Sequence, residues 1–351
     1  MLFCASMRRI PQLDLLRVAA VVLVIWNHFP FFRLVGVGSW IGVDLFFVLS
    51  GFLISGLLFD DIKNTGNVRL GRFYLRRAFK IYPAFYFFLL AGILVDPAIR
   101  KLPYWSELLF VQNYFPHVWG HTWSLAVEEH FYLALPLLLM LLVRGKRLHW
   151  VPPIALAIGT ACLAARVFYC ARGNWDVTPF YSHTRFDALF LGVTLGYYFH
   201  FHQQRFCRWT SNSLLYVGLL LILPPFVLVA HPAILYSIGL TSIAAGFGCI
   251  VVWFINHERL RSPQIEKIGQ HSYSIYLWHL PIVLILRNEF SGFLPFLGTV
   301  ALCFIVGIVM ANIVEFPMLH LRDRLTASRK PLLTPAPSLA TELSMSAQSS
   351  Q

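Results

Sequence analysis

Charged residues are scarce in this chain. Asp, Glu, Lys and Arg make up only 13% of its 351 residues, whereas a soluble domain carries about 25%. Hydrophobic residues account for 58%, and the mean hydropathy is +0.65. This composition excludes an ordinary soluble domain and indicates an integral membrane protein.

Acidic residues are the scarcer charge class, with 16 Asp and Glu against 28 Lys and Arg. A net charge of +12 in a soluble protein would suggest a nucleic-acid partner. Here the basic residues collect in loops between apolar segments, as they do on the cytoplasmic side of membrane proteins. No basic and aromatic patch of a folded soluble domain is visible, so we expect no nucleic-acid partner.

Cysteine is also rare. None of the six cysteines forms a CxxC pair, and several lie inside apolar runs. The pattern argues against a disulfide framework and against a thiolate metal site, so we expect no metal. No small-residue cleavage site clearly follows the first apolar run, so we expect that run to be retained as a span.

The apolar residues divide into segments of the length that crosses a bilayer as a helix, about 20 residues each. We therefore predict an all-α bundle of about ten transmembrane helices over residues 13–317, with no internal repeat and no second, soluble domain. Residues 1–12 precede it, and residues 318–351 form a tail that is basic and then rich in Pro and Ser, as in disordered segments. The spans are expected at about 13–31, 40–59, 80–96, 129–143, 150–170, 185–202, 212–231, 233–255, 271–287 and 293–315.

Basic residues assign a side to each loop. With the N-terminus inside, twenty of the 28 Lys and Arg residues fall in inner segments and five in outer ones. This bias agrees with the positive-inside rule and predicts that both termini are cytoplasmic.

The first span carries two ionisable residues, Arg17 near its inner end and His28 near its outer end. Eleven residues separate them, which is about 16 Å along a helix and close to three turns, so they project from nearly the same face. Asp14 lies one turn before Arg17 and is a plausible partner. Arginine at a helix end commonly extends to the interface, and histidine occurs in interfacial aromatic belts, so a structural role stays open for both.

Four more polar residues share the predicted depth of His28: Asp44, Glu128, Arg185 and Asp187. They could converge with it on one outer cavity. A histidine beside a carboxylate is a general base with an orienting partner. The alternative is a polar cluster that only holds helices together.

The inner side is basic. Arg72, Arg76, Arg77 and Lys80 come just before the third span. Arginine forks match phosphate oxygens, which favours a phosphate-binding site, although positive-inside topology alone also predicts basic residues here.

Two further ionisable residues lie within spans: His279 halfway across the ninth, and Glu315 near the inner end of the tenth. Such residues are costly in lipid and usually functional. On composition alone, they fit a proton-coupled transporter or channel as well as an enzyme.

Several motifs occur in an order that resembles one family. These are LDLLRVAAVVLVIWNH, GVDLFFVLSGFLIS, RRAFKIYP, WSLAVEEHFYL, RFDALFLG, SYSIYLWH and VEFP. Together they resemble the membrane acyltransferases of family 3, which include O-acyltransferases of bacterial surface polysaccharides, over about residues 13–317. Arg17 and His28 match the signature of the first span, and Glu128 matches the carboxylate of the Trp-Ser-Leu-x-x-Glu segment.

The resemblance implies transfer of an acyl group, usually acetyl, from cytoplasmic acyl-CoA to a hydroxyl of a carbohydrate-containing acceptor at the outer side. Arg77, Lys80 and Arg76 would meet the CoA phosphates, and no permanently bound cofactor is implied. His28 would act as general base or as a transient acyl carrier. Glu128 would orient it.

Arg17 would hold the donor or a structural carboxylate. Asp14, Asp44, Arg185, Asp187, His279 and Glu315 would form a supporting polar site.

The chain departs from the family pattern at two positions, because Lys80 replaces a second arginine and His130 stands where glutamine is common. We expect no extracytoplasmic hydrolase-like domain of the kind that some members carry, so a partner protein could assist with the acceptor. The implied location is the inner membrane of a bacterium. A transporter remains the main alternative.

Overall fold

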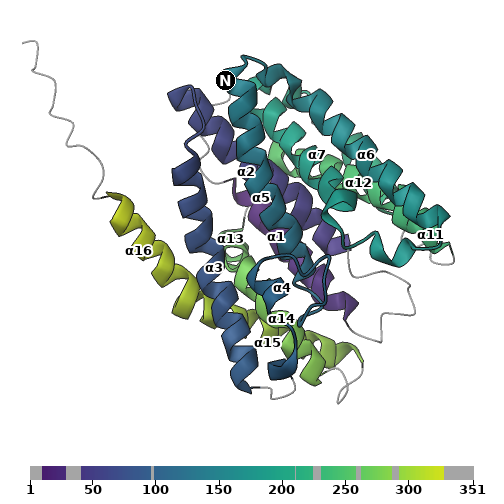
Figure 1. Cartoon of the computed structure of the whole chain (residues 1–351). Coiled ribbons are helices and arrows are strands. Elements are labelled where there is room, and N and C mark those ends of the chain that lie inside the picture. The colour runs from purple at the N-terminus through teal and green to yellow at the C-terminus, as the bar shows by residue number, and fades with distance from the viewer. Residues whose placement is uncertain are drawn as a thin grey trace, which may run out of the picture.

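The computed structural model describes residues 10–28, 41–95, 99–209, 211–223, 231–257, 262–286 and 292–327, and every regular element in them is a helix. Figure 1 shows the long helices packed side by side as a bundle. The all-α prediction is therefore confirmed for the described residues. The expectations for residues 1–9 and for the tail after residue 327 lie outside them.

The helices follow the predicted spans closely. The longer ones are α1 (Pro11–Asn27), α2 (Ile41–Thr65), α3 (Leu70–Val95), α5 (Trp123–Arg144), α6 (Val151–Ala171), α7 (Ser182–Phe201), α9 (Asn212–Ile222), α12 (Leu240–Asn256), α14 (Ser272–Leu286), α15 (Phe293–Met310) and α16 (Phe316–Ala327). Short turns connect them: η2 (Ile99–Lys101), α4 (Trp105–Leu108), η3 (Leu148–Trp150), η4 (Trp175–Val177), α8 (Gln203–Phe206), α11 (Pro232–Ile234) and α13 (Pro263–Gly269). Two stretches are π-helical, η5 (Leu235–Gly239) and η6 (Ala311–Glu315).

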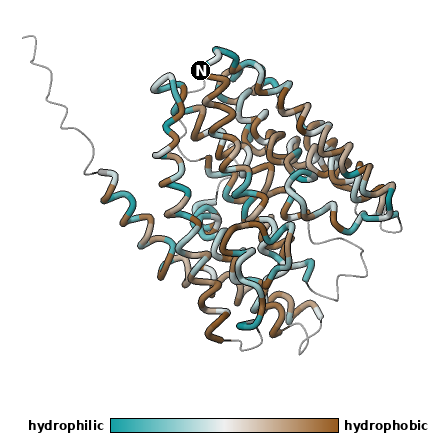
Figure 2. Tube along the Cα trace, viewed as in Figure 1, coloured by the Kyte–Doolittle hydropathy of each residue, from teal (hydrophilic) through white to brown (hydrophobic). Residues whose placement is uncertain are grey.

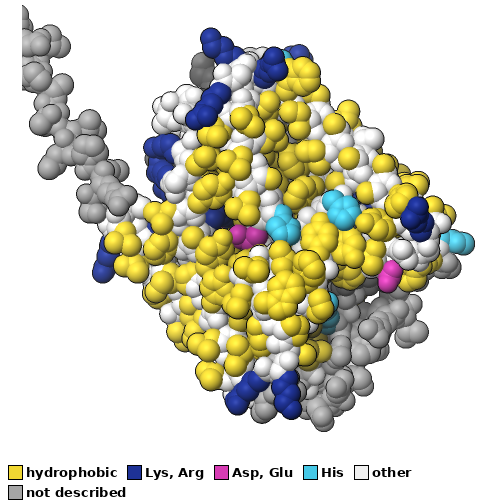
Figure 3. All heavy atoms as spheres, viewed as in Figure 1, with side chains coloured by type: hydrophobic (Ala, Val, Ile, Leu, Met, Phe, Trp, Pro, Cys, Tyr) yellow, Lys and Arg dark blue, Asp and Glu magenta, His cyan; other side chains and the backbone are white. Residues whose placement is uncertain are grey.

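The helices have the length and surface of a membrane bundle. By length and composition, six of the described helical segments can cross a bilayer, and each of the ten predicted spans overlaps a helix. The total of ten and the sidedness of the termini stay predictions. In Figure 2 hydrophobic residues predominate along the long helices. In Figure 3 the visible face is mostly hydrophobic, with Lys and Arg gathered toward its ends.

Helix α2 forms the centre of the bundle. Of the six long apolar segments it is the most enclosed, with 78% of its apolar window buried. It packs closely on α7 through glycine: a Cβ on Gly51 would lie 1.9 Å from the carbonyl oxygen of Leu189. Small residues allow this approach of two backbones, which is a common basis for helix association in membranes.

Two segments outside the predicted spans also contain helix. The aromatic stretch after α3 contains the single turn α4. Within it, Glu107 is fully buried and accepts from the backbone N–H groups of Val118 (2.6 Å) and Trp119 (3.3 Å). The basic part of the predicted tail continues the last span as α16, which packs on α3.

Candidate active site

Three cavities adjoin one another within the bundle. A basic cavity of about 440 Å³ shares Arg17, Arg77 and Lys80 with a central cavity of about 150 Å³. The central cavity shares Val43 and Tyr276 with a third cavity of about 410 Å³, which contains His28 and His121 and is called here the histidine cavity. The shared walls join the basic residues to the histidines in one row.

The basic cavity lies between α1, α2, α3 and α16. Six cationic side chains line it, against one carboxylate, Asp61: Arg17, Arg72, Arg76, Arg77, Lys80 and Arg322. The predicted basic residues before the third span therefore do meet at one cavity. Arg17 also pairs with Asp14 at 2.6 Å, as the sequence spacing suggested.

Arg77 is held between two aromatic rings. Its guanidinium lies 5.9 Å from the ring centroid of Phe73 and 5.6 Å from that of Tyr132. Among the described residues no carboxylate lies within ion-pair distance of it. Arg77 thus contacts two rings by cation–π interactions and lines both the basic and the central cavity.

Lys80 has a different environment. It pairs with Glu315 of η6, whose other carboxylate oxygen accepts from Ser274 of α14 at 2.7 Å. The π-helical bulge η6 presents Glu315 toward α3 and α14, because bulges re-aim single side chains within a helix. The charge of Lys80 is therefore largely balanced inside the protein.

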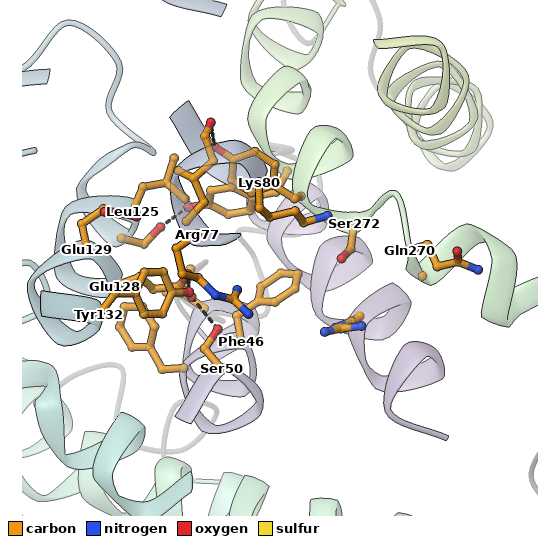
Figure 4. Close-up of a pocket in the computed structure, with 18 residues that line it drawn as sticks. Phe46, Ser50, Arg77, Lys80, Leu125, Glu128, Glu129, Tyr132, Gln270 and Ser272 are labelled. Atoms are coloured by element: carbon orange, nitrogen blue, oxygen red, sulfur yellow. Dashed lines mark hydrogen bonds between the residues drawn. The ribbon is translucent and has the colours of Figure 1, made fainter. Parts of the chain in front are cut away.

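Glu128 lies in the central cavity. One of its oxygens accepts from Ser50 of α2 (2.8 Å) and the other from Tyr132 (2.6 Å). Figure 4 shows Arg77, Glu128 and Ser50 pointing toward one another. The neighbouring Glu129 accepts from Tyr82 at 3.1 Å.

Three histidines from distant parts of the chain meet here: His28 and His121 line the histidine cavity, and His279 packs against both. His28 directly follows α1, His121 precedes α5, and His279 lies within α14. The ring centroids of His28 and His279 are 5.3 Å apart, and those of His121 and His279 are 5.1 Å apart. His279 is completely buried beneath the other two.

Backbone carbonyls define which nitrogens carry protons. His279 donates from Nδ1 to the oxygen of Tyr276, and His121 donates from Nε2 to that of Leu277 at 3.0 Å. The other ring nitrogens, His279 Nε2 and His121 Nδ1, have no hydrogen-bond partner in the described part of the chain. Burial lowers the pKa of His121 to about 3, so its ring is neutral at physiological pH.

The remaining predicted outer residues form separate buried ion pairs. Asp44 of α2 pairs with Arg185 of α7 at 2.7 Å, and both are 1% exposed. Asp187 pairs instead with Arg166 of α6 at 2.7 Å. The predicted outer group is thus divided: His28 lines one cavity, Glu128 another, and the two aspartates lie in helix–helix contacts.

Two residues of the site were not predicted from the sequence. His121 belongs to a loop, where helical periodicity gives no depth, although it stands just before the WSLAVEEHFYL motif. Arg322 lay in the expected tail and reaches the basic cavity because α16 continues. Among the described residues, no group of three or more His, Cys, Asp or Glu side chains could hold a metal ion.

Comparison with known proteins gives the class to which this arrangement belongs. The model of the acyltransferase 3 family, described as an acyltransferase domain, matches residues 10–313. The chain belongs to this family, and the resemblance found in its motifs is confirmed.

Its relatives include O-acetyltransferases. The chain is 29% identical over 318 residues to the peptidoglycan O-acetyltransferase OatA of Listeria monocytogenes, covering 79% of this chain and 50% of that protein. It is 28% identical over 326 residues to a Staphylococcus aureus (strain COL) protein named "Putative O-acetyltransferase", covering 83% and 53%. The chain thus spans about half the length of the curated relatives it matches. No solved structure matches it.

Proposed function

We propose that this chain is a membrane O-acyltransferase. It moves an acyl group, acetyl in the simplest case, from acyl-CoA on the cytoplasmic side to a hydroxyl of a carbohydrate-containing acceptor on the outer side. The observation that carries the proposal is the row of adjoining cavities, which links six cations to His28. A donor with a phosphorylated head and a long arm fits such a row.

The phosphates of acyl-CoA bind in the basic cavity. Arg77 is the main contact, because among the described residues it has no carboxylate partner and its guanidinium is held in place by Phe73 and Tyr132. Arg76, Arg72 and Arg322 add positive charge around it. Lys80 contributes less than the sequence motif suggests, because Glu315 already balances its charge.

The pantetheine arm extends through the central cavity and carries the thioester toward His28. Ser50, Glu128 and Tyr132 give this cavity a polar wall joined by hydrogen bonds. Arg17 lines the basic and central cavities and stabilises the junction through its pair with Asp14.

His28 is the general base. Its ring removes the proton of the acceptor hydroxyl as the oxygen attacks the thioester carbonyl carbon. The tetrahedral intermediate collapses, the C–S bond breaks, and the imidazolium returns the proton to the CoA thiolate. The products are the acylated acceptor and CoA with a free thiol.

The buried His279 positions the His28 ring, since its ring lies 5.3 Å away and its Nδ1 proton is fixed by Tyr276. The motif implies that Glu128 orients His28. Glu128 lines the central cavity, whereas His28 lines the histidine cavity, so this role would require an intervening group between the two side chains. A transient acyl-histidine at His28 is the variant of this chemistry in which the two substrates react in turn.

The acceptor class is suggested by the relatives, one of which is named for peptidoglycan. We propose the cytoplasmic membrane of a bacterium as the location. Because those relatives are about twice as long, a partner protein or a further domain for handling the acceptor is part of the proposal.

The decisive test is His28→Ala, assayed for transfer of labelled acetyl from acetyl-CoA in membranes that contain the full chain. We expect transfer to fall by roughly 10²–10⁴-fold, the usual contribution of a general base, with unchanged protein level. His149→Ala, which changes a histidine at η3 remote from the cavities, is the matched control and should keep full activity. Retained transfer in His28→Ala would exclude His28 as the base.

A further inference from the structure

The histidine cavity has an aromatic wall that the chemistry at His28 leaves unexplained. Trp175 of η4 and Tyr236 of η5 line it together with His28. Their rings are parallel within 2°, with centroids 5.6 Å apart. They are 61 residues apart in the sequence, and Trp175 is 38% exposed, so its ring is accessible from outside the bundle.

The wall continues toward the protein interior. Trp123 of α5 also lines the cavity and meets Phe180 edge to face, with ring centroids 5.2 Å apart. The carboxylate of Asp176, next to Trp175, stands at the exposed end. The cavity thus combines flat apolar surfaces with one anionic group, and its volume of about 410 Å³ falls within the range of small-molecule sites.

A chain of hydrogen bonds holds the aromatic pair in place. The Thr178 hydroxyl lies 2.8 Å from the carbonyl oxygen of Trp175 and 3.3 Å from that of Tyr236, and can donate to either. Thr184, at the start of α7, donates in turn to the carbonyl oxygen of Thr178 at 2.7 Å.

The buried Arg166 secures both segments from behind. It is 0% exposed and donates to the carbonyl oxygens of Thr184 and Ser237, and to the carboxylate of Asp187. Ser237 directly follows Tyr236 within the π-helical stretch η5. Burying the Arg166–Asp187 ion pair costs desolvation free energy, and in return Arg166 holds the backbone that carries Trp175 and Tyr236. A binding site that is held in place in this way loses less conformational entropy when a ligand binds.

We propose that Trp175, Tyr236 and Asp176 form a binding site for one neutral pyranose ring of the acceptor. The inference rests on the proposed function. A pyranose has an apolar C–H face that packs on an aromatic ring, and hydroxyl groups at its edge that donate to a carboxylate. The negative charge of Asp176 repels uronic acids and other anionic sugars. Bound there, the sugar lies in the same cavity as His28.

The test is binding of two matched probes to the full chain in lipid nanodiscs, followed by saturation-transfer NMR without acyl-CoA. The neutral probe is the N-acetylglucosamine tetramer and the acidic probe is the galacturonic acid tetramer. We expect the neutral probe to bind, with the strongest transfer to its ring C–H protons, and the acidic probe to bind at least about tenfold more weakly. Equal binding of the two probes, or binding of neither, would overturn the proposal.

Trp175→Ala should weaken binding of the neutral probe about tenfold, as expected for loss of an aromatic anchor, while Trp175→Phe keeps most of it. Trp150→Ala is the control, because Trp150 is also an exposed tryptophan but lies at the opposite end of α6. Unchanged binding in Trp175→Ala would refute the site. Equal loss in the Phe variant, together with lowered thermal stability, would show that Trp175 is only structural.

Asp176→Asn tests the charge. We expect it to increase binding of the acidic probe while binding of the neutral probe changes little, and no gain for the acidic probe would contradict the role of Asp176.

These binding results are independent of acyl transfer. If the neutral probe binds as expected but the chain transfers no acetyl, the proposed function fails; if transfer occurs but Trp175→Ala binds normally, only the sugar site fails.

Discussion

At the scale of single residues, most charges inside the bundle are balanced by a partner. Arg185 pairs with Asp44, Arg166 with Asp187, and Lys80 with Glu315. Such pairs reduce the cost of charge in a medium that solvates it poorly. Arg77 differs from them, since among the described residues it meets rings rather than a carboxylate.

This difference predicts the effect of Arg77→Ala. The KM for acyl-CoA should rise by roughly tenfold or more, the size of one lost charge-assisted contact, while the KM for the acceptor changes little. Steady-state transfer assays with each substrate varied in turn measure both constants. Arg172→Ala provides the control, because Arg172 is a cation stacked on Phe168 outside the three cavities. Equal changes in both KM values would argue against a phosphate contact.

At the scale of elements, the position of the site depends on close contacts between helices. The α2–α7 contact is the closest, and it places Ser50 of α2 toward Glu128 and Asp44 toward Arg185. A Cβ on Gly192 would lie 2.3 Å from the carbonyl oxygen of Val48 and 2.6 Å from the N of Phe52. These atoms are backbone and cannot move aside cheaply.

Gly192→Ala should therefore destabilise the protein by about 1–3 kcal/mol, the usual cost of overpacking. Thermal unfolding in detergent, followed by tryptophan fluorescence, should show a lower Tm. Gly298→Ala in α15 is the matched control, since a Cβ there meets nothing within 4 Å. A Tm for Gly192→Ala equal to that of the control would show that α2 and α7 separate more easily than this packing implies.

At the scale of the whole molecule, the apolar outer surface and the row of cavities point to a bundle that spans a membrane with a basic end. The basic cavity lies at the end of α1 that carries Arg17, and the histidine cavity at the end that carries His28. The positive-inside bias predicts that the first of these faces the cytoplasm.

Cysteine labelling tests this orientation. In a chain whose native cysteines are replaced by serine, Lys146→Cys should react with a membrane-impermeant maleimide only after the cells are opened. Lys101→Cys and Arg172→Cys should react in intact cells. All three positions are exposed, so access is set by the side of the membrane. Labelling of Lys146→Cys in intact cells would reverse the predicted topology.

Much of the fold could be predicted because membrane helices are local. Each span needs an apolar run of a certain length, and a run is visible in the sequence without knowledge of its neighbours. The pairing of Arg17 with Asp14 was predictable for the same reason, since helical spacing brings residues three apart together. Loops have no such periodicity, which is why the place of His121 in the site was not predicted.

The amino-acid sequence by itself determined the class of this protein: an all-α membrane bundle of the acyltransferase 3 family, with motifs around Arg17, His28 and Glu128. Only the tertiary structure decided which of these groups meet. In the folded chain His279 packs against His28 and His121, and Trp175 stacks on Tyr236. Glu128 accepts a hydrogen bond from Ser50. The physical reason is that helix spacing specifies depth and face, whereas the neighbour across an interface depends on how closely two backbones can pack.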